Sequence, residues 1–275
     1  MKSIIFIVFF GFVVSATVTS APQAELWDAW LPYDAESRIE VDHTAWDTIL
    51  ERYLITDDRS GVNLFAYSLV TSEDKSTLET YIRTLEAVAV ERLNRDEQMA
   101  YWINMYNAVT VAVVLDHMPV KSIRDISLGG GLFTRGPWDA AVVTVNETSL
   151  TLNDVEHRIL RPIWDDPRIH YAVNCASIGC PNLQGEAFTA RNLEMQLEHA
   201  AREYINHERG VDPDGRTLRL SSIHDWFSED FGDTREAILG HIYRYAEADL
   251  RERLAPFLAG DGRLRYRYDW ALNAP

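Results

Sequence analysis

Positive charge is scarce in this 275-residue sequence. Its 26 Lys and Arg residues stand against 42 Asp and Glu residues, which gives a net charge of −16. A chain with this charge repels nucleic acid and anionic membrane surfaces, so neither is expected as a partner. The acidic residues are spread along the chain instead of being gathered in a tail. That pattern favours solubility or a salty habitat over a dedicated partner.

The familiar signatures of cofactor and metal sites are also missing. The chain has no G-x-G-x-x-G that opens a helix, no Walker loop, no H-E-x-x-H and no G-x-S-x-G. We therefore expect no cofactor and no bound metal. Internal repeats, low-complexity tracts and Pro- or Ser-rich linkers are absent as well, which favours one continuous domain over residues 22–275.

Long apolar runs are limited to one, from Ile4 to Val14, which follows Lys2 and precedes small residues. It is shorter than the roughly 20 residues of a membrane-spanning helix. The order of basic, apolar and small residues is typical of a secretory signal peptide, here over 1–21, with cleavage between Ala16 and Ala21. An uncleaved anchor is the alternative. We expect a periplasmic or secreted protein that meets the membrane only through this segment, in an oxidising compartment.

Cysteine is nearly absent, because Cys175 and Cys180 of HYAVNCASIGCP (170–181) are the only two. Export, the even count and a bend at Gly179 favour a Cys175–Cys180 disulfide. Alternatively, Cys175 is a nucleophile, which requires a nearby base and a lowered pKa. A zinc site of two Cys and two His lacks the usual ligand spacing, and two inert core cysteines are the fourth alternative. The sequence leaves the choice open.

Apolar periodicity and turn residues predict a mainly helical chain. Helices are expected over 44–55, 72–88, 94–118, 153–164, 189–210, 234–246 and 248–257, and Ser72 and Asn153 are expected N-caps. Strands are expected over 142–145 and 149–152 as a hairpin, over 168–173, within 211–220 and in the tail 262–273, and a Gly-rich loop over 129–138. Helices come first and a mixed stretch follows. The fold class is therefore α+β, a single mainly helical domain packed on a small mixed or antiparallel sheet.

The segment YWINMYNAVTVAVV (101–114) is apolar on almost every face, which is typical of a buried helix. It nevertheless carries Asn104 and Asn107, which lie three residues apart and so share one face. A buried amide without partners costs about 1–3 kcal/mol, so both side chains need hydrogen bonds. They either brace neighbouring backbone or line a buried site, where they would orient a histidine or polarise a substrate carbonyl.

The acid–base candidates lie near the cysteines in sequence. His157 is close to an expected helix start, where the dipole favours the neutral imidazole that suits a general base. A satisfied, partly buried histidine is the alternative. Glu156, three residues after Asn153, is expected to cap the helix, and adjacent residues of an α-helix point about 100° apart. His170 has the opposite strand parity to Cys175 and is the weaker base candidate.

Five stretches are distinctive when taken in order. They are YWINMYNAVTV, SLTLNDVEHRILR, DPRIHYAVNCASIGCPNL, FTARNLEMQLEHAAREYIN and YDWALN. Together they resemble the family called domain of unknown function 547 over about residues 90–273. The family-like positions are Trp102, Asn104, Tyr106, Asn107, Asp154, Glu156, His157, Asp166, Arg168, His170, Asn174, Cys175, Cys180, Asp269 and Trp270. The resemblance implies one α+β domain, found in exported bacterial proteins and within larger plant proteins, and no settled substrate.

Two functional hypotheses follow. By fold analogy, the family is similar to papain- or transglutaminase-type cysteine hydrolases. In the first hypothesis, an exported hydrolase or acyl-transferase uses Cys175 as nucleophile on an amide or thioester, His157 as base, and Asn104 and Asn107 to orient the base or polarise the carbonyl. The supporting or substrate-binding candidates are Glu156, Arg168, His170 and Asn174. The substrate would be a small molecule, a peptide or a cell-envelope component. In the second, the chain is a non-catalytic binding or scaffold domain with a Cys175–Cys180 disulfide.

Overall fold

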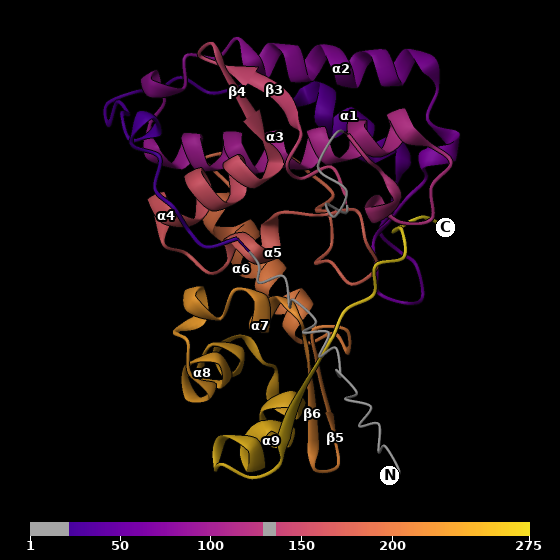
Figure 1. Ribbon diagram of the computed structural model, residues 1–275, viewed down its shortest axis with the longest axis vertical. Coiled ribbons are helices and arrows are strands. Elements are labelled where there is room, and N and C mark those ends of the chain that lie inside the picture. Colours follow the sequence, from indigo (N-terminus) through magenta and orange to yellow (C-terminus); the bar gives the residue numbers. More distant parts are fainter. Residues whose placement is uncertain (1–21, 129–135) are drawn as a thin grey trace, which may run out of the picture.

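The computed structural model describes residues 22–128 and 136–275, and the architecture is α+β, as predicted (Figure 1). The predicted signal peptide and most of the Gly-rich loop at 129–138 lie outside the described residues. The strands of the described part form three small separate sheets instead of one. Across these same residues, no helix is long and apolar enough to cross a membrane.

Helix α3 (Arg95–His117) forms the centre of the upper part of the molecule in Figure 1. The helix begins next to Asn94, where the sequence placed its start, and Asn94 is its N-cap, whose side chain accepts from the Glu97 N–H group. The helix is buried on nearly every face and lies within the larger of two hydrophobic clusters. The elements around it are α1 (Thr44–Tyr53), β1 (Leu54–Ile55), β2 (Leu64–Phe65), α2 (Ser72–Glu86), β3 (Ala141–Val145) and β4 (Thr148–Thr151).

The lower part of the molecule holds the second hydrophobic cluster, between a three-stranded sheet and a set of helices (Figure 1). The sheet order is β5-β6-β7, with β5 antiparallel and β7 parallel to β6. Buried Leu218 and Leu220 of β6 belong to the same cluster as Ile238 and Ile242 of α8. The elements are α6 (Leu193–Ile205), β5 (Val211–Asp214), β6 (Thr217–Ser221), α7 (Ile223–Trp226), α8 (Arg235–Tyr245), α9 (Ala248–Leu258) and β7 (Arg263–Arg267).

Short helical segments lie between these two parts in the chain and carry Glu156, His157 and His170. They are the π-helix η5 (Asp154–Leu160), α4 (Arg161–Trp164) and α5 (Ile169–Ala172). The 3-10 segments are η1 (Asp28–Trp30), η2 (Tyr67–Leu69), η3 (Val90–Arg92), η4 (Ile123–Asp125) and η6 (Ser228–Phe231). The wider i→i+5 turn of a π-helix is uncommon and is frequently associated with functional sites.

The C-terminal tail ties the lower part to the upper part. In Figure 1 it climbs from the lower part towards the upper part, where it ends below α3. Leu272 forms an antiparallel bridge with Ser177. The carbonyl of Asn273 accepts the N–H group of Phe65 at 2.7 Å, and the Leu272 N–H group donates to Lys121 at 2.8 Å. The loop that carries the cysteines is therefore covered by the end of the chain.

The predicted strand over 168–173 is wrong, because Ile169–Ala172 is the short helix α5. The N–H group of His170 donates to the carbonyl of Pro167, and that of Val173 to Ile169. Short apolar runs fit strand and helix equally well by periodicity, and here the turn after Pro167 starts a helix. The strand-parity argument that separated His170 from Cys175 no longer applies.

Helix caps also differ from the prediction at two places. Thr71, not Ser72, caps α2, and its hydroxyl accepts from the Asp74 N–H group. Asn153 makes no capping bond, and the side chain of Asp154 turns back to Thr151 instead. The predicted capping box of Asn153 and Glu156 is therefore wrong, and the acidic side chain that bonds back to the preceding turn is Asp154.

Other boundaries shift without changing the class. The hairpin of β3 and β4, the helices α8 and α9 and the last strand β7 are confirmed. The region 211–220, predicted as a turn and one strand, is a two-stranded hairpin. Helix α6 ends at Ile205 instead of Gly210, because the chain turns at His207 to feed β5.

Candidate active site

Cys175 lies in a loop directly after α5, with three sulfur and oxygen groups around its side chain. Its Sγ is 2.9 Å from the Sγ of Cys180, 3.0 Å from the Tyr268 hydroxyl and 3.2 Å from the Ser177 hydroxyl. Both cysteines are free thiols. Cys175 is partly exposed, whereas Cys180 is 4% exposed. The partly exposed sulfur is the one that has three possible donors.

The loop around Cys175 is held by buried asparagines. The N–H group of Asn174 donates to Asn107 Oδ1 at 2.8 Å, and Asn107 Nδ2 donates to the Ala172 carbonyl at 3.0 Å. Asn174 Oδ1 accepts from the Ala176 N–H group. Ala176 is fully buried with φ of 57°, a left-handed conformation that non-glycine residues rarely adopt. Backbone strain of this kind is concentrated at functional sites.

Gly179 allows the loop to fold back so that Cys180 reaches Cys175. The N–H group of Gly179 donates to the Asp269 carbonyl at 2.8 Å. A Cβ at position 179 would lie 2.7 Å from the Asp269 nitrogen, so only glycine fits against the C-terminal tail. The Tyr204 hydroxyl donates to the Gly179 carbonyl at 2.6 Å and fixes the bend from the other side.

The two thiols differ in acidity. Burial raises the pKa of Cys175, but hydrogen bonds from Cys180, Ser177 and Tyr268 outweigh burial and bring the pKa below its ordinary value of 9.0. Burial raises the pKa of Cys180, and the neighbouring Cys175 raises it further, to well above the ordinary range. Cys175 is therefore the more acidic thiol of the pair.

A buried network of charged groups lies on η5, α5 and η6. His170 Nε2 donates to Asp230 Oδ2 at 2.5 Å, and His170 Nδ1 is 3.6 Å from Glu156 Oε1. Burial lowers the pKa of His170, but the bonds to Asp230 and Glu156 raise it overall above 6.5. Burial would raise the pKa of Glu156, but the neighbouring groups of the network, including His170 and Arg161, bring it to about 2. His170 is thus an imidazolium between two carboxylates.

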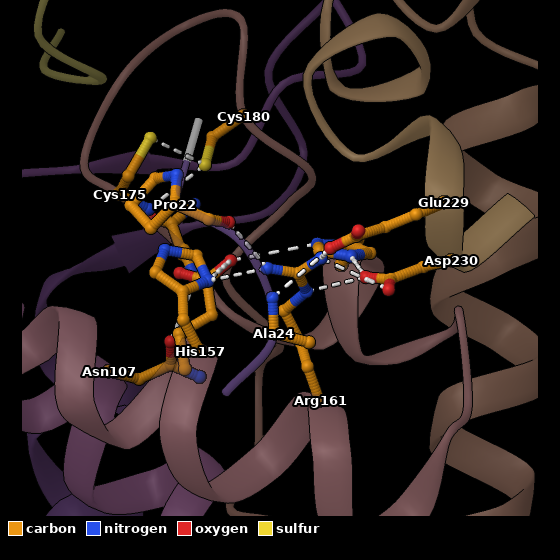
Figure 2. Close-up of polar contacts among 12 residues, drawn as sticks. Pro22, Ala24, Asn107, His157, Arg161, Cys175, Cys180, Glu229 and Asp230 are labelled. Carbon is orange, nitrogen blue, oxygen red and sulfur yellow. Dashed lines mark hydrogen bonds and ion pairs between the residues drawn. The ribbon is translucent and has the colours of Figure 1, made fainter. Parts of the chain in front are cut away.

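Arg161 links this network to His157 and to the start of the described chain (Figure 2). Its guanidinium donates to Asp230 through Nε and Nη2, at 2.5 and 3.0 Å, and to Glu229 at 2.6 Å. Nη1 donates to the Pro22 carbonyl at 2.8 Å and to His157 Nδ1 at 3.1 Å. Four residues therefore accept hydrogen bonds from a guanidinium that is almost wholly buried.

The contact with Arg161 determines the protonation of His157. A guanidinium can only donate, so His157 Nδ1 accepts and the imidazole proton is on Nε2. Burial lowers the pKa of His157 and Arg161 lowers it further, which outweighs the opposing effect of Glu156. The imidazole is neutral, as predicted, although burial is the main cause. His157 Nδ1 is also 4.0 Å from Glu156 Oε1 on the π-helix, closer than the α-helix argument predicted.

The first described residues lie along η5. The N–H groups of Glu25 and Trp27 donate to the carbonyls of His157 and Arg158, at 2.9 and 3.1 Å. An adjacent surface pocket of about 790 Å³ has His157 in its wall, and Cys175 is not among its lining residues. The lining residues are Pro22, Gln23, Ala24, Glu25, Asp139, Thr151, Asn153, Asp154, His157 and Arg158.

Comparison with known families now assigns the central part of this structure. Residues 90–205 match the family model described as "Protein of unknown function, DUF547". The chain carries a DUF547 domain. The matched stretch runs from η3 to the end of α6 and includes both cysteines, η5 and α5. No curated protein and no solved structure matched the chain significantly.

The DUF547 domain brings some of the predicted site residues together and separates others. Glu156, His157 and His170 share the charged network, and none of them makes a hydrogen bond to Cys175 in the described structure. Arg168 pairs with Asp166 and Glu194 at the N-terminal ends of α5 and α6, away from the thiols.

The two predicted amides of α3 both bond to backbone. Asn104 pairs with the N–H and carbonyl groups of Phe188 and approaches His43 Nε2 at 3.2 Å. Asn107 pairs with the backbone on either side of Val173. Both amides brace backbone, Asn104 also contacts the ring of His43, and Asn107 positions the loop of Cys175.

Other residues of the DUF547 domain and its C-terminal extension were not predicted. Tyr268 stands directly before the Asp269-Trp270 pair that the sequence singled out, and Ser177 follows Cys175 by two positions. No local sequence pattern indicated the ion pair of Arg161 and Asp230, because the two residues lie 69 positions apart in the chain. Across the described ranges, no cluster of three or more His, Cys, Asp or Glu side chains could hold a metal, so the zinc alternative has no ligand set there.

Proposed function

We propose that this protein is an exported cysteine-dependent hydrolase or acyl-transferase that acts on an amide or thioester, with Cys175 as nucleophile. The observation that supports it is the surroundings of the Cys175 sulfur. Three donors, from Cys180, Ser177 and Tyr268, lower the pKa of a partly exposed thiol. Reactive cysteines are typically found in such partly accessible sites with a depressed pKa.

The chemistry begins with attack of the Cys175 thiolate on the acyl carbon. The bond from the acyl carbon to the leaving nitrogen or sulfur then breaks, and a thioester on Cys175 remains. Water or an acceptor nucleophile resolves this thioester and frees the thiolate. The neighbouring hydroxyls and the Cys180 thiol lower the pKa of Cys175 without a histidine in contact with the sulfur, so the thiolate can form by loss of its proton to solvent.

His157 is kept in the proposal as the acid–base group for the later proton transfers. Its neutral imidazole carries the proton on Nε2, and it forms part of the wall of the pocket beside η5. Two contacts hold the His157 ring in place. Arg161 donates a hydrogen bond to its Nδ1 atom, and the Phe227 ring packs against it with 5.6 Å between the ring centroids.

Export places the proposed substrate in the periplasm or outside the cell. The basic, apolar and small-residue segments at 1–21 support export. A peptide, a small acylated molecule or a cell-envelope component would then be the substrate. The net charge of −16 disfavours nucleic acid. A papain- or transglutaminase-type fold stays a prediction.

A second candidate function rests on the distance between the sulfurs. At 2.9 Å the two thiols need only a small shift to form a disulfide, whose S–S bond is about 2.0 Å. A stable Cys175–Cys180 disulfide in the oxidising compartment would leave a non-catalytic binding or scaffold domain. Intact mass before and after reduction separates the two candidates, since a gain of two hydrogens on reduction marks the disulfide.

The test of the proposed function is covalent trapping on Cys175. The reduced full chain is incubated with a panel of acyl thioesters and activated acyl esters, and the digested protein is analysed by mass spectrometry. We expect an acyl adduct on Cys175 that decays with time by hydrolysis and decays faster when an amine acceptor is added. The Cys175→Ser variant should form no such adduct at this position. Absence of any adduct on Cys175 across the panel, in folded protein, would contradict the proposal.

A further inference from the structure

The two thiols are unequal in a way that a simple structural pair does not require. Cys175 is partly exposed, and the hydroxyls of Ser177 and Tyr268 both lie within hydrogen-bond distance of its sulfur. Cys180 is 4% exposed, and its sulfur accepts the N–H group of Cys175 at 2.9 Å. Cys175 is therefore the member of the pair that is open to solvent, and the Cys180 sulfur lies 2.9 Å from the Cys175 sulfur.

We propose that Cys175 and Cys180 form a redox-active pair that exchanges with an external disulfide, with Cys175 as the attacking thiol and Cys180 as the resolving thiol. The substrate class is a low-molecular-weight disulfide or an exposed disulfide of a peptide. This activity rests on the same nucleophilic Cys175 as the proposed function. It adds a role for Cys180 that acyl chemistry does not need.

The exchange balances in two steps. In the first, the Cys175 thiolate attacks one sulfur of the external disulfide, a mixed disulfide forms, and one thiolate leaves. In the second, Cys180 loses its proton to solvent and attacks the Cys175 sulfur, which expels the other thiolate. The protein loses two electrons and two protons in becoming the Cys175–Cys180 disulfide, and the external disulfide gains the two electrons.

The surroundings of the loop favour both steps. The hydroxyls of Ser177 and Tyr268 stabilise negative charge on Cys175 when it attacks and again when it leaves during reduction. Arg209 lies against the Cys180 loop, where it donates to the Ile178 carbonyl at 3.3 Å and to Asn182 at 2.5 Å. Its fixed positive charge supports the thiolate that Cys180 must form in the second step.

The same contacts make the pair reversible without unfolding. The chain turns between Ser177 and Cys180, and the Cys180 N–H group donates to the Ser177 carbonyl at 3.0 Å. This turn already brings the two sulfur atoms to 2.9 Å from each other. Closing a bond of about 2.0 Å needs a movement of about 1 Å. Gly179 and Tyr204 hold the turn in place in both states.

The experiment uses the reduced full chain, freed of reductant, and three forms of it. The wild type, Cys180→Ser and Cys175→Ser are each mixed with oxidised glutathione and, in a separate arm, with a small disulfide-bonded peptide. Intact mass is followed over time. Serine is close in size to cysteine, and a hydroxyl at position 180 can still accept the Cys175 N–H group.

The expected result differs for each form. The wild type loses two hydrogens and releases two equivalents of thiol, without lasting adduct. Cys180→Ser accumulates a stable mixed disulfide on Cys175, and Cys175→Ser does not react because Cys180 is buried. Reaction in only one arm identifies whether small-molecule or peptide disulfides are the substrate.

Two outcomes would overturn the exchange while sparing the proposed function. One is a lasting mixed disulfide on the wild type, since Cys180 then fails to resolve it. The other is a Cys180→Ser variant that forms no mixed disulfide but is still acylated on Cys175. If Cys175 accepts neither an acyl group nor a thiol, both proposals fail. Should Cys180→Ser not fold, titration of the wild type against glutathione redox buffers decides: one two-electron transition is expected, and its absence overturns the exchange.

Discussion

Tyr268 places its hydroxyl 3.0 Å from the Cys175 sulfur although 93 positions separate the two residues in the chain. The contact exists because the C-terminal tail leaves β7 and runs across the cysteine loop. Tyr268 also lies in an aromatic group, at 4.8 Å from Trp226 and 4.6 Å from Trp270 between ring centroids. The end of the chain thereby supplies a donor to the sulfur and the packing that holds this donor.

Removal of that hydroxyl should weaken the acidity of Cys175. Tyr268→Phe keeps the ring but removes a hydrogen bond to a charged group, which is worth about 1.5–3 kcal/mol. The pKa of Cys175 should rise by about 1–2 units. The rate of alkylation against pH measures it. Tyr266→Phe is the matched control, because Tyr266 is exposed two residues earlier, and an equal shift in both variants would contradict the assignment.

The close approach at Gly179 predicts a loss of stability in Gly179→Ala. The new Cβ would lie 2.7 Å from the Asp269 nitrogen, so the loop or the tail must move. We expect the free energy of unfolding to fall by about 1–3 kcal/mol. Gly185→Ala is the control, since its nearest contact is Thr56 Cγ2 at 3.9 Å. Denaturant unfolding that shows equal effects at the two glycines would refute the close contact.

The ion pair of His170 and Asp230 predicts a particular pH dependence of stability. The pKa of His170 is raised in the fold, so its contribution is complete below pH 6.5 and is lost as pH rises through the folded pKa. Burial raises the pKa of Asp230, but His170 and Arg161 bring it down to about 2, so its contribution is lost as pH falls towards that value. The pair by itself therefore stabilises the fold most at mildly acidic pH, whereas the stability that depends on the neutral forms of His43, His224 and His241, whose pKa burial lowers to about 4, 3 and 4, is lost as the pH falls below 6.5.

Asp230→Asn tests this directly. Removing one partner of a largely buried ion pair costs about 3–5 kcal/mol, and the decline of stability above pH 6.5 should flatten because His170 no longer has its raised pKa. The control is Glu229→Gln, whose partner Arg161 is shared but whose carboxylate is exposed, so about 1 kcal/mol or less is expected. Unfolding free energies across pH 4–8 that do not distinguish the two variants would contradict the account.

His157 should influence catalysis without setting the acidity of Cys175. Within the described residues, it makes no hydrogen bond to the sulfur, and its Nδ1 accepts from Arg161. His157→Gln should therefore leave the alkylation profile of Cys175 within about 0.3 units of the wild type, while acyl transfer slows by about 100-fold or more if it is the acid–base group. A rise of a full unit in the pKa of Cys175 would show a direct ion pair instead.

The class of the fold and most of its helices were predictable from local signals. The run from Asn94 and the all-round apolar pattern of 101–114 identified α3, and regular spacing identified α8 and α9. The strand expected at 168–173 failed because four to six apolar residues do not distinguish a strand from a helical turn. The π-helix could not be predicted, because i→i+5 bonding leaves no separate apolar period.

The candidate site was predictable in its residue types more than in its contacts. The sequence identified Cys175, Glu156, His157 and His170 as candidates. It did not show which of these side chains contact each other in the fold. Their partners come from distant segments, as Tyr268 does for Cys175. Asn107 was predicted to need partners, and the backbone around Val173 supplies them. Tertiary contacts of this kind depend on the path of the tail and loops, which local patterns do not encode.

The central claim, that Cys175 is an activated thiol, is tested most directly by the pH dependence of its alkylation. Reduced native protein is treated with iodoacetamide over a range of pH, and labelling at each cysteine is followed by peptide mass spectrometry. We predict a midpoint for Cys175 below the ordinary value of 9.0 and no labelling of Cys180 until the protein unfolds. A midpoint at or above 9.0, or preferential labelling of Cys180, would contradict the account.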